Sequence, residues 1–377
     1  MAYLLNDDSK SLVEMMRDFG EKELKDKVAE YDKKGEFPEE LVEMGKEMGL
    51  HLLEVPAEYG GSGLDYRTLA AIYEELGKYD AGYSTTFSAS GLGMKPVLIA
   101  GNDEQKKMFF DIINQGNLAA FCLTEPNAGS DAGSGQSTAV LDGDDYIING
   151  RKTFITNGGV AGVYTVFALT DKSKGVKGMS AFIVDRNTPG VSVGKEEDKM
   201  GIRLSNTTDV IFDNVRVPKE NLLGKEGKGF GIAMKTLDLA RPYIGAIAVG
   251  VAQRGLDEAV KYSKERVQFG KPIARLQAIQ FKLADMQIKI ETARQMVSHT
   301  FDLVEAGLPY NKEAAIAKAY AGDIAMEVSS EAIQVLAGYG YSREYPVEKL
   351  LRDAKIFQIF EGTNEIQRVV IAGNLLR

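Results

Sequence analysis

The sequence predicts an α+β protein in which a mostly antiparallel β domain lies between two helical domains. Apolar residues recur at spacings of three and four over residues 1–118 and again over residues 226–377. Between them, residues 119–225 contain short β-type runs separated by Gly, Asp and Asn turns. A chain of 377 residues also exceeds the ~250–300 residues at which one hydrophobic core stops growing. We therefore expect three domains, at residues 1–118, 119–225 and 226–377.

The first domain is predicted to be a helical bundle. One of its apolar stripes consists of Leu12, Met15, Met16 and Phe19. A glycine-rich loop over residues 56–63 interrupts the helices. The small residues of segment 84–93 lack the bulk to fill a core, so they either wall a cavity or let helices approach closely. Close packing is the favoured interpretation.

The middle domain carries five β-type runs, at residues 146–148, 163–169, 179–184, 191–193 and 210–212. Strands this short, without intervening helices, predict a mostly antiparallel sheet or a small barrel. The glycine-rich stretch 223–231 follows without a GK[ST] motif or a βαβ context. We therefore interpret it as a linker rather than a phosphate-binding loop.

The last domain is predicted to contain two long helices. One has an apolar stripe of Ile279, Leu283, Met286, Ile290, Ala293 and Val297. The other covers residues 314–336 and ends before a turn at 337–340. Helices with such apolar faces usually pack against partners, so this bundle is also expected to form an oligomer interface.

Composition disfavours several classes of function. A net charge of -9 argues against nucleic-acid binding, which needs a basic face. No apolar run reaches the ~20 residues that span a bilayer, and no basic-then-apolar leader opens the chain, so we expect a cytoplasmic protein without membrane contact. With Cys122 as the one cysteine and His51 and His299 as the two histidines, neither a disulfide within the chain nor a His- or Cys-rich metal site is expected.

A carboxylate near the C-terminus is the strongest candidate for chemistry. Glu361 follows the apolar pair Ile359 and Phe360, and Gly362 comes next, which would let another molecule approach the backbone closely. The segment could present a base to a buried substrate. It could equally be a helix end followed by a turn, with Thr363 as the N-cap of the next helix. Taken with the rest of the chain, the catalytic interpretation is favoured.

Two stretches of the middle domain, 121–131 and 154–159, differ from ordinary strand-and-turn sequence. Each joins an aromatic residue and a threonine to a glycine-bearing loop. Such a segment offers a planar ligand a stacking face, a hydroxyl and backbone N–H donors. Either stretch by itself would be interpreted as a hairpin turn, but the two together indicate a binding site.

These segments together resemble the acyl-CoA dehydrogenase family. The resemblance rests on Leu123-Thr124-Glu125-Pro126 with Gly129-Ser130-Asp131, Ile155-Thr156-Asn157-Gly158-Gly159, the Arg266 to Gly270 segment, Gly338-Tyr339-Gly340 and Glu361-Gly362-Thr363-Asn364. They occur in family order along the whole chain. The resemblance implies an FAD enzyme with the cofactor between the β domain and the C-terminal helices. It also implies a homo-oligomer, at least a dimer and by preference a dimer of dimers.

The resemblance implies roles for individual residues. FAD contacts are expected from Phe121, Leu123, Thr124, Gly129, Ser130, Phe154, Ile155, Thr156, Gln277, Thr363 and Asn364. The FAD of the neighbouring subunit is expected to be reached by Arg266, Phe269, Gln334 and Gly338. Substrate contacts are expected from Ser130, Asp238, Arg241 and Gly362. Phe154 stands where many family members have Trp. Because Phe is also aromatic, it should still stack on the flavin.

The reaction implied by the resemblance is α,β-dehydrogenation of an acyl-CoA thioester. Glu361 would take the α-proton while the β-hydrogen leaves as hydride to flavin N5, and the Glu361 backbone N–H and a ribityl hydroxyl would hold the carbonyl. Burial should raise the pKa of Glu361 from about 4.3 toward the ~6–7 that suits a base. Electrons are expected to be exchanged with an electron-transferring flavoprotein. The same site run in reverse is an enoyl-CoA reductase.

Other carboxylates are weaker candidates for the base. Some family members carry it at the position of Ala240, and alanine cannot accept a proton. Asp238 lies two residues from that position, and Glu365 lies a helical turn past Gly362. Glu361 is therefore the predicted base. A non-catalytic flavin-binding protein and a flavin oxidase or monooxygenase on the same fold are the alternatives from other classes.

The acyl group is less well defined. Residues 198–201 and 264–266 resemble bacterial butyryl-CoA dehydrogenases of the short- and medium-chain branch. Lys95 and Tyr243, however, are expected beside the acyl pocket and depart from that pattern. They leave room for an aromatic or alicyclic acyl group.

Overall fold

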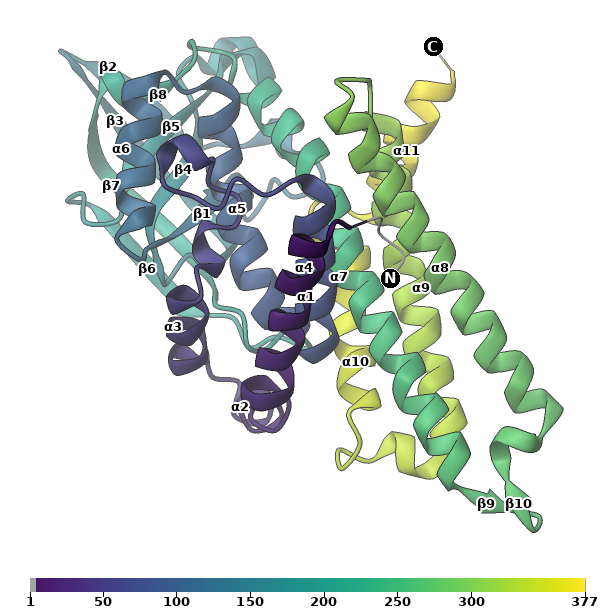
Figure 1. Ribbon diagram of the computed structural model, residues 1–377. Coiled ribbons are helices and arrows are strands. Elements are labelled where there is room, and N and C mark those ends of the chain that lie inside the picture. Colours follow the sequence, from purple (N-terminus) through teal and green to yellow (C-terminus); the bar gives the residue numbers. More distant parts are fainter. Residues whose placement is uncertain (1–4, 377) are drawn as a thin grey trace.

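The N-terminal part of the chain is helical, as predicted (Figure 1). The computed structural model describes residues 5–376. The first helices are α1 (Asp7–Phe19), α2 (Val28–Lys34), α3 (Glu39–Glu47), α4 (Tyr66–Tyr79), α5 (Ala81–Ala100) and α6 (Asp103–Asn114). Asp or Asn side chains cap four of them by accepting a backbone N–H, at Asn6, Asp65, Asp80 and Asn102.

The middle part forms a sheet of β1 (Leu118–Cys122), β2 (Thr138–Asp142), β3 (Asp145–Thr156), β4 (Ala161–Leu169), β5 (Met179–Asp185), β6 (Val191–Glu196), β7 (Thr207–Pro218) and β8 (Leu222–Leu223). The strand order is β6-β7-β3-β2-β4-β5-β8, with β1 paired to β4. Most pairs are antiparallel, which confirms the predicted sheet; β1 and β2 pair with β4 in parallel.

The interpretation of segment 223–231 as a linker is wrong at both ends. Leu222 and Leu223 pair with β5, and Gly229 is already the first residue of the next helix. A Cβ atom at Gly229 would press against the backbone of Ser180, so only glycine lets this helix start so close to the sheet.

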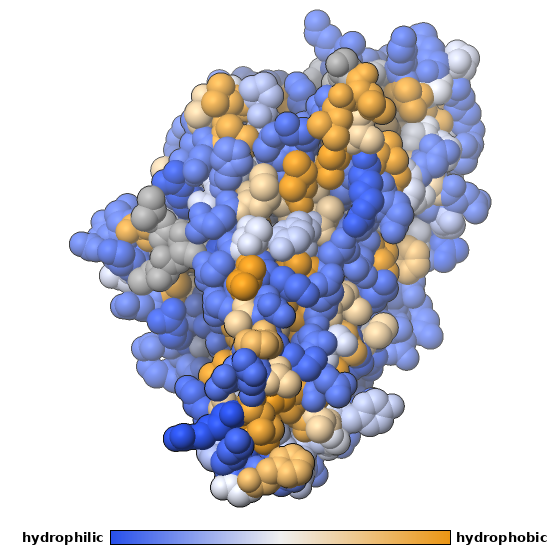
Figure 2. All heavy atoms as spheres, turned by 90° about the vertical axis from the view of Figure 1, so that its right-hand side faces the viewer, coloured by the Kyte–Doolittle hydropathy of each residue, from blue (hydrophilic) through white to orange (hydrophobic). Residues whose placement is uncertain are grey.

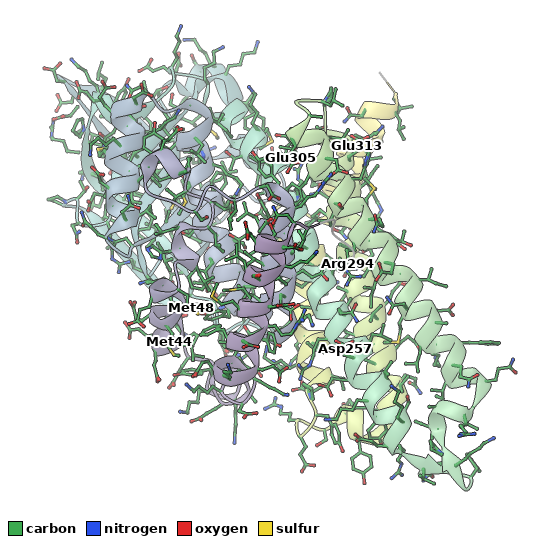
Figure 3. All side chains as sticks on the ribbon, viewed as in Figure 1. Met44, Met48, Asp257, Arg294, Glu305 and Glu313 are labelled. Atoms are coloured by element: carbon green, nitrogen blue, oxygen red, sulfur yellow. The ribbon has the colours of Figure 1, made fainter. Side chains whose placement is uncertain are left out.

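The C-terminal part contains α7 (Gly229–Glu265), the hairpin β9 (Val267–Gln268) and β10 (Lys271–Pro272), α8 (Gln277–Glu305), α9 (Asn311–Leu336), α10 (Val347–Ala354) and α11 (Asn364–Leu375). Helices α7, α8 and α9 lie side by side (Figure 1). Arg294 of α8, labelled in Figure 3, is buried. Its Nε donates to Oε1 of Glu74 on α4 at 2.9 Å. This contact joins the first and last helical parts.

Small residues let helices α4 and α7, and helix α5 and strand β1, approach each other closely. A Cβ atom at Gly250 of α7 would overlap the carbonyl oxygen of Glu74, so the glycine permits α4 and α7 to cross. In α5, Ser90 Oγ accepts the N–H of Ala119 at 2.9 Å, and a Cβ at Gly93 would lie 2.9 Å from Ala119 Cβ. The run 84–93 therefore packs closely against β1, as favoured from the sequence.

Within residues 5–376, no helix combines the length and apolarity needed to cross a membrane. In the same part of the chain, no group of three or more His, Cys, Asp or Glu side chains is arranged to hold a metal ion.

Candidate active site

The C-terminal candidate lies in a strained turn between α10 and α11. Glu361 has φ 56°, in the left-handed region that residues other than glycine rarely occupy. Gly362 has φ 89°. Such a conformation costs about 1–3 kcal/mol and persists only where the surroundings impose it. Thr363 caps α11, since its Oγ1 accepts the N–H of Ile366 at 3.3 Å. The predicted N-cap is therefore confirmed as the local structure of this turn.

Two buried side chains hold the backbone of the turn. Lys318 of α9 donates from Nζ to the Gly362 carbonyl at 2.8 Å and to Asn364 Oδ1 at 3.0 Å. Gln367 Nε2 donates to the carbonyls of Gly362 at 2.9 Å and Glu361 at 3.2 Å. Neither Lys318 nor Gln367 is solvent-exposed. These bonds account for the strained conformation, and sequence reasoning missed Lys318.

The carboxylate and the backbone N–H of Glu361 are left available to bind a ligand. Its Oε2 is buried and has no hydrogen-bond partner, and no hydrogen bond to its backbone N–H is found within residues 5–376. Burial raises the pKa of Glu361 to about 7, although the charges of Lys95, Arg241 and Lys318 act to lower it. Burial likewise lowers the pKa of Lys318 to about 7. Glu361 can therefore gain or lose a proton near neutral pH.

Two of the four predicted substrate residues, Asp238 and Arg241, lie together on α7. Arg241 is buried, and its Nη1 donates to Asp238 Oδ1 at 2.5 Å. Its Nε is buried and has no hydrogen-bond partner among the described residues 5–376. A Cβ atom built on Gly362 would lie 3.8 Å from Arg241 Nη2, which places the guanidinium beside the turn. Burial raises the pKa of Asp238, although Arg241 opposes this.

The two aromatic, threonine-bearing stretches are adjacent. Thr153 N–H donates to the Thr124 carbonyl at 2.9 Å, which joins the stretch after β1 to the end of β3. Buried Lys152 reinforces the junction by donating to the Leu123 carbonyl at 3.2 Å and to Glu125 Oε1 at 2.7 Å. The structure thus brings segments 121–131 and 154–159 to one place.

This junction suits a planar cofactor. Phe154 has φ 54° and a side chain that is 66% exposed, between buried Thr153 and Ile155. A large aromatic ring held in water gains apolar contacts when a flat ring covers it. Gly129 and Ser130 are exposed, and a Cβ at Gly129 would meet open space. The residues present therefore fit FAD.

A third group lies at the far end of the C-terminal bundle. It comprises Arg266, Phe269, Gln277, Gln334 and Gly338, at or near the β9–β10 end of helices α7, α8 and α9 (Figure 1). The Arg266 guanidinium is 5.5 Å from the ring centroid of Tyr339, and Phe269 at the hairpin tip is 90% exposed. The turn at Glu361 is held by Lys318 in the N-terminal half of α9, whereas Gln334 lies in the last turn of that helix.

Asn364 differs from the other predicted cofactor residues. It is buried, and its Nδ2 donates to the Ala319 carbonyl at 3.0 Å while its Oδ1 accepts from Lys318. The side chain thus orders the turn. Its predicted contact with the cofactor stays a prediction.

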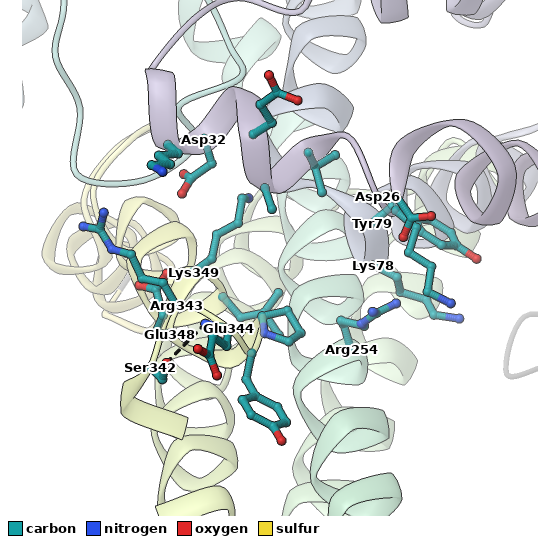
Figure 4. Close-up of a pocket in the computed structure, with 18 residues that line it drawn as sticks. Asp26, Asp32, Lys78, Tyr79, Arg254, Ser342, Arg343, Glu344, Glu348 and Lys349 are labelled. Carbon is teal, nitrogen blue, oxygen red and sulfur yellow. Dashed lines mark hydrogen bonds between the residues drawn. The ribbon is translucent and has the colours of Figure 1, made fainter. Parts of the chain in front are cut away.

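A separate groove of about 630 Å³ lies between α2 and the segment 342–350 (Figure 4). It is lined mainly by charged residues, among them Lys25, Arg254 and Glu348. None of the predicted site residues lines it.

Comparison with known proteins identifies the family. Models of the acyl-CoA dehydrogenase N-terminal, middle and C-terminal domains match residues 6–117, 120–215 and 227–376. The chain is 49% identical to a short-chain specific acyl-CoA dehydrogenase of Megasphaera elsdenii, over 100% of both chains. It is 44% identical to the caffeyl-CoA reductase-Etf complex subunit CarC of Acetobacterium woodii, over 99% of both.

A solved structure of butyryl-CoA dehydrogenase from Megasphaera elsdenii superposes with a TM-score of 0.97, at 48% identity and with both chains covered completely. The fold, the full-length match and the residues that fit a flavin agree with the resemblance seen in the sequence. The chain therefore belongs to the acyl-CoA dehydrogenase family, and it is an FAD-dependent oxidoreductase.

Proposed function

We propose that this enzyme dehydrogenates a short acyl-CoA thioester between its α and β carbons, with Glu361 as the base. The observation that carries the proposal is the strained turn that holds a carboxylate with a buried, unpaired Oε2 and a pKa of about 7. A base with such a pKa is largely ionised just above neutral pH yet strong enough to remove a proton. FAD, when bound, supplies the acceptor for the β-hydride.

The backbone around Glu361 supports the same step. Its N–H is free to donate to the thioester carbonyl, where negative charge develops as the α-proton leaves. Arg241 lies beside Gly362 with its Nε unpaired, so it adds positive charge to this side of the site. We assign substrate contacts to Ser130, Asp238, Arg241 and Gly362.

We assign the flavin ring to the junction of segments 121–131 and 154–159. Phe154, Ile155 and Thr156 would lie along one side of it. Phe121, Leu123 and Thr124 would line the other. The exposure of Phe154 supports this assignment, because a solvated ring is otherwise unfavourable. Gly129, Ser130, Thr363 and Asn364 complete the proposed set within one subunit.

We also propose a homo-oligomer, at least a dimer and by preference a dimer of dimers. The residues predicted to reach a neighbouring FAD lie at or near the β9–β10 end of the bundle (Figure 1); they are Arg266, Phe269, Gln334 and Gly338. Gln277, a further predicted FAD contact, lies at the same end. Apolar side chains are spread over the face of the C-terminal bundle in Figure 2. Exposed examples on α8 and α11 are Phe281, Ile288 and Val369. Sedimentation of a fully FAD-loaded monomer would contradict this.

The electron partner is proposed to be an electron-transferring flavoprotein. The 44% identical CarC is named as a subunit of a caffeyl-CoA reductase-Etf complex, which supports this partner. The word reductase in that name also supports the reverse direction, reduction of an enoyl-CoA. The cytoplasmic location and the domain boundaries at 118/119 and 225/226 stay predictions.

Anaerobic titration of the oxidised enzyme with a panel of short acyl-CoA thioesters tests the function. We expect bleaching of the flavin by at least one saturated thioester, and its recovery on adding the matching enoyl-CoA or an electron-transferring flavoprotein. Rapid reoxidation by air with release of peroxide would indicate an oxidase instead. Absence of bleaching by every saturated thioester, and of reoxidation of the chemically reduced enzyme by every enoyl-CoA, would refute the proposed function.

A further inference from the structure

A buried ionic cluster lies deeper in the protein than the turn at Glu361. Lys95 of α5 is 2% exposed and forms an ion pair with Glu54, whose side chain is 7% exposed. Tyr73 of α4 donates from its hydroxyl to Glu54 Oε1 at 2.9 Å. Lys95 Nζ also lies 4.8 Å from the ring centroid of Tyr243 on α7. We refer to Glu54, Tyr73, Lys95 and Tyr243 as the Glu54–Lys95 cluster.

The surrounding sequence makes room for this charge pair. Gly91 lies one helical turn before Lys95 on the same face of α5. A Cβ atom at Gly91 would overlap Oε1 of Glu54, so the carboxylate fits only against glycine. Removing two charges from water is costly, and replacing a buried ion pair with apolar side chains of similar volume is often neutral or stabilising. The cluster therefore suggests a role other than packing.

The cluster borders the proposed active site. Helix α7, which carries Tyr243, also carries Arg241, and Arg241 lies beside Gly362. The charges of Lys95 and Glu54 also act on the Glu361 carboxylate. If Glu361 contacts the α-carbon, a short acyl chain extends only a few ångströms beyond it. The groups whose charges act on Glu361 are then the candidates to meet the far end of that chain.

We propose that the Glu54–Lys95 cluster recognises a neutral hydroxyl or carbonyl group at the far end of a short acyl chain. This inference rests on the proposed function. An ammonium has three N–H donors, and within residues 5–376 Glu54 supplies its one hydrogen-bond acceptor. In the same part of the chain, the Tyr243 hydroxyl has no hydrogen-bond partner. Both groups can therefore bond a polar substituent.

The charge balance selects a neutral substituent. Glu54 already compensates the charge of Lys95, so a carboxylate on the substrate would add an unpaired negative charge near Glu54 and Glu361. An unsubstituted alkyl end would leave the remaining Lys95 donors unpaired and desolvated. A hydroxyl or carbonyl avoids both costs.

Matched pairs of thioesters test the proposal on the FAD-loaded enzyme. The pairs are butanoyl-CoA with 4-hydroxybutanoyl-CoA, and 3-phenylpropanoyl-CoA with 3-(4-hydroxyphenyl)propanoyl-CoA; glutaryl-CoA supplies a carboxylate end. Anaerobic flavin reduction gives kcat/KM for each. In at least one pair, kcat/KM for the hydroxylated thioester should exceed kcat/KM for its plain partner by about 10- to 100-fold, as expected for a hydrogen bond to a charged group. It should also exceed kcat/KM for glutaryl-CoA.

Variants assign the preference to the cluster. The quantity compared is the ratio of kcat/KM for the hydroxylated thioester to kcat/KM for its plain partner. In the double variant Glu54→Gln, Lys95→Met this ratio should fall to about one. Tyr243→Phe, which removes only the hydroxyl, should lower the ratio partly. Lys107→Met is the matched control, because that lysine is 72% exposed, and its ratio should stay at the wild-type value. No preference in either pair of the wild type, or a preference kept by both cluster variants, would overturn the proposal. If the wild-type flavin is reduced by none of the thioesters, plain ones included, and the reduced enzyme is reoxidised by no enoyl-CoA, the proposed function itself is refuted.

Discussion

Replacing Glu361 with Gln should stabilise the folded protein above neutral pH, because the carboxylate is ionised there at a cost. Burial raises its pKa from 4.5 to about 7. A shift of about 2.5 pKa units at 1.36 kcal/mol per unit corresponds to roughly 3 kcal/mol. Because the folded pKa lies above the unfolded one, this cost is absent below pH 4.5, grows between pH 4.5 and 7 and is complete above pH 7. Gln does not titrate, so it avoids the cost.

Thermal unfolding of the FAD-loaded wild type and Glu361→Gln at pH 5 and pH 8 measures this difference. At each pH we take the Tm of the variant minus the Tm of the wild type. We expect this difference to be a few degrees larger at pH 8 than at pH 5. Glu365→Gln is the matched control, because Glu365 is exposed in the first turn of α11. An equal Tm difference at the two pH values would refute the argument that burial of Glu361 destabilises its charged form.

Three further predictions follow from named groups. The rate of flavin reduction at limiting substrate should rise with pH with a midpoint near 7, the pKa of Glu361; a midpoint near 4.5 in stopped-flow data would contradict this. Phe154→Ala should weaken FAD binding in a fluorescence titration while leaving the circular dichroism unchanged, since the ring is 66% exposed. Lys349→Met should destabilise the protein by about 3–5 kcal/mol in urea unfolding, because it leaves the buried carboxylates of Asp80 and Asp353 unpaired; a loss under 1 kcal/mol would contradict this.

Local patterns were sufficient to predict much of the fold and the position of the turn. The β-type runs lie within β3 to β7, because alternation and turn residues act over a few neighbours. Thr363 caps α11 for the same local reason. The start of α7 was misjudged, since Gly229 looked like a loop residue. Its helical role depends on close contact with Ser180, which lies 49 residues earlier in the sequence.

The contacts that tune the candidate site could not be found from local patterns, although the resemblance to the family had placed Lys95 beside the acyl pocket. Lys318 bonds Gly362 across 44 residues, and Lys95 pairs with Glu54 across 41. Their one sequence signal was a lysine among small or apolar residues, which is weak because lysine stems often cover apolar surface. Only the fold shows that both side chains are buried and act on Glu361.

The most direct test of the account is the rate of flavin reduction by Glu361→Gln. The variant is loaded with FAD and mixed anaerobically in a stopped-flow instrument with the thioester that reduces the wild type fastest. Gln is nearly isosteric with Glu, so FAD and thioester binding should persist while reduction slows by at least ~10²- to 10⁴-fold, as for loss of a general base. Reduction at a rate within a few-fold of the wild type would show that Glu361 is not the base.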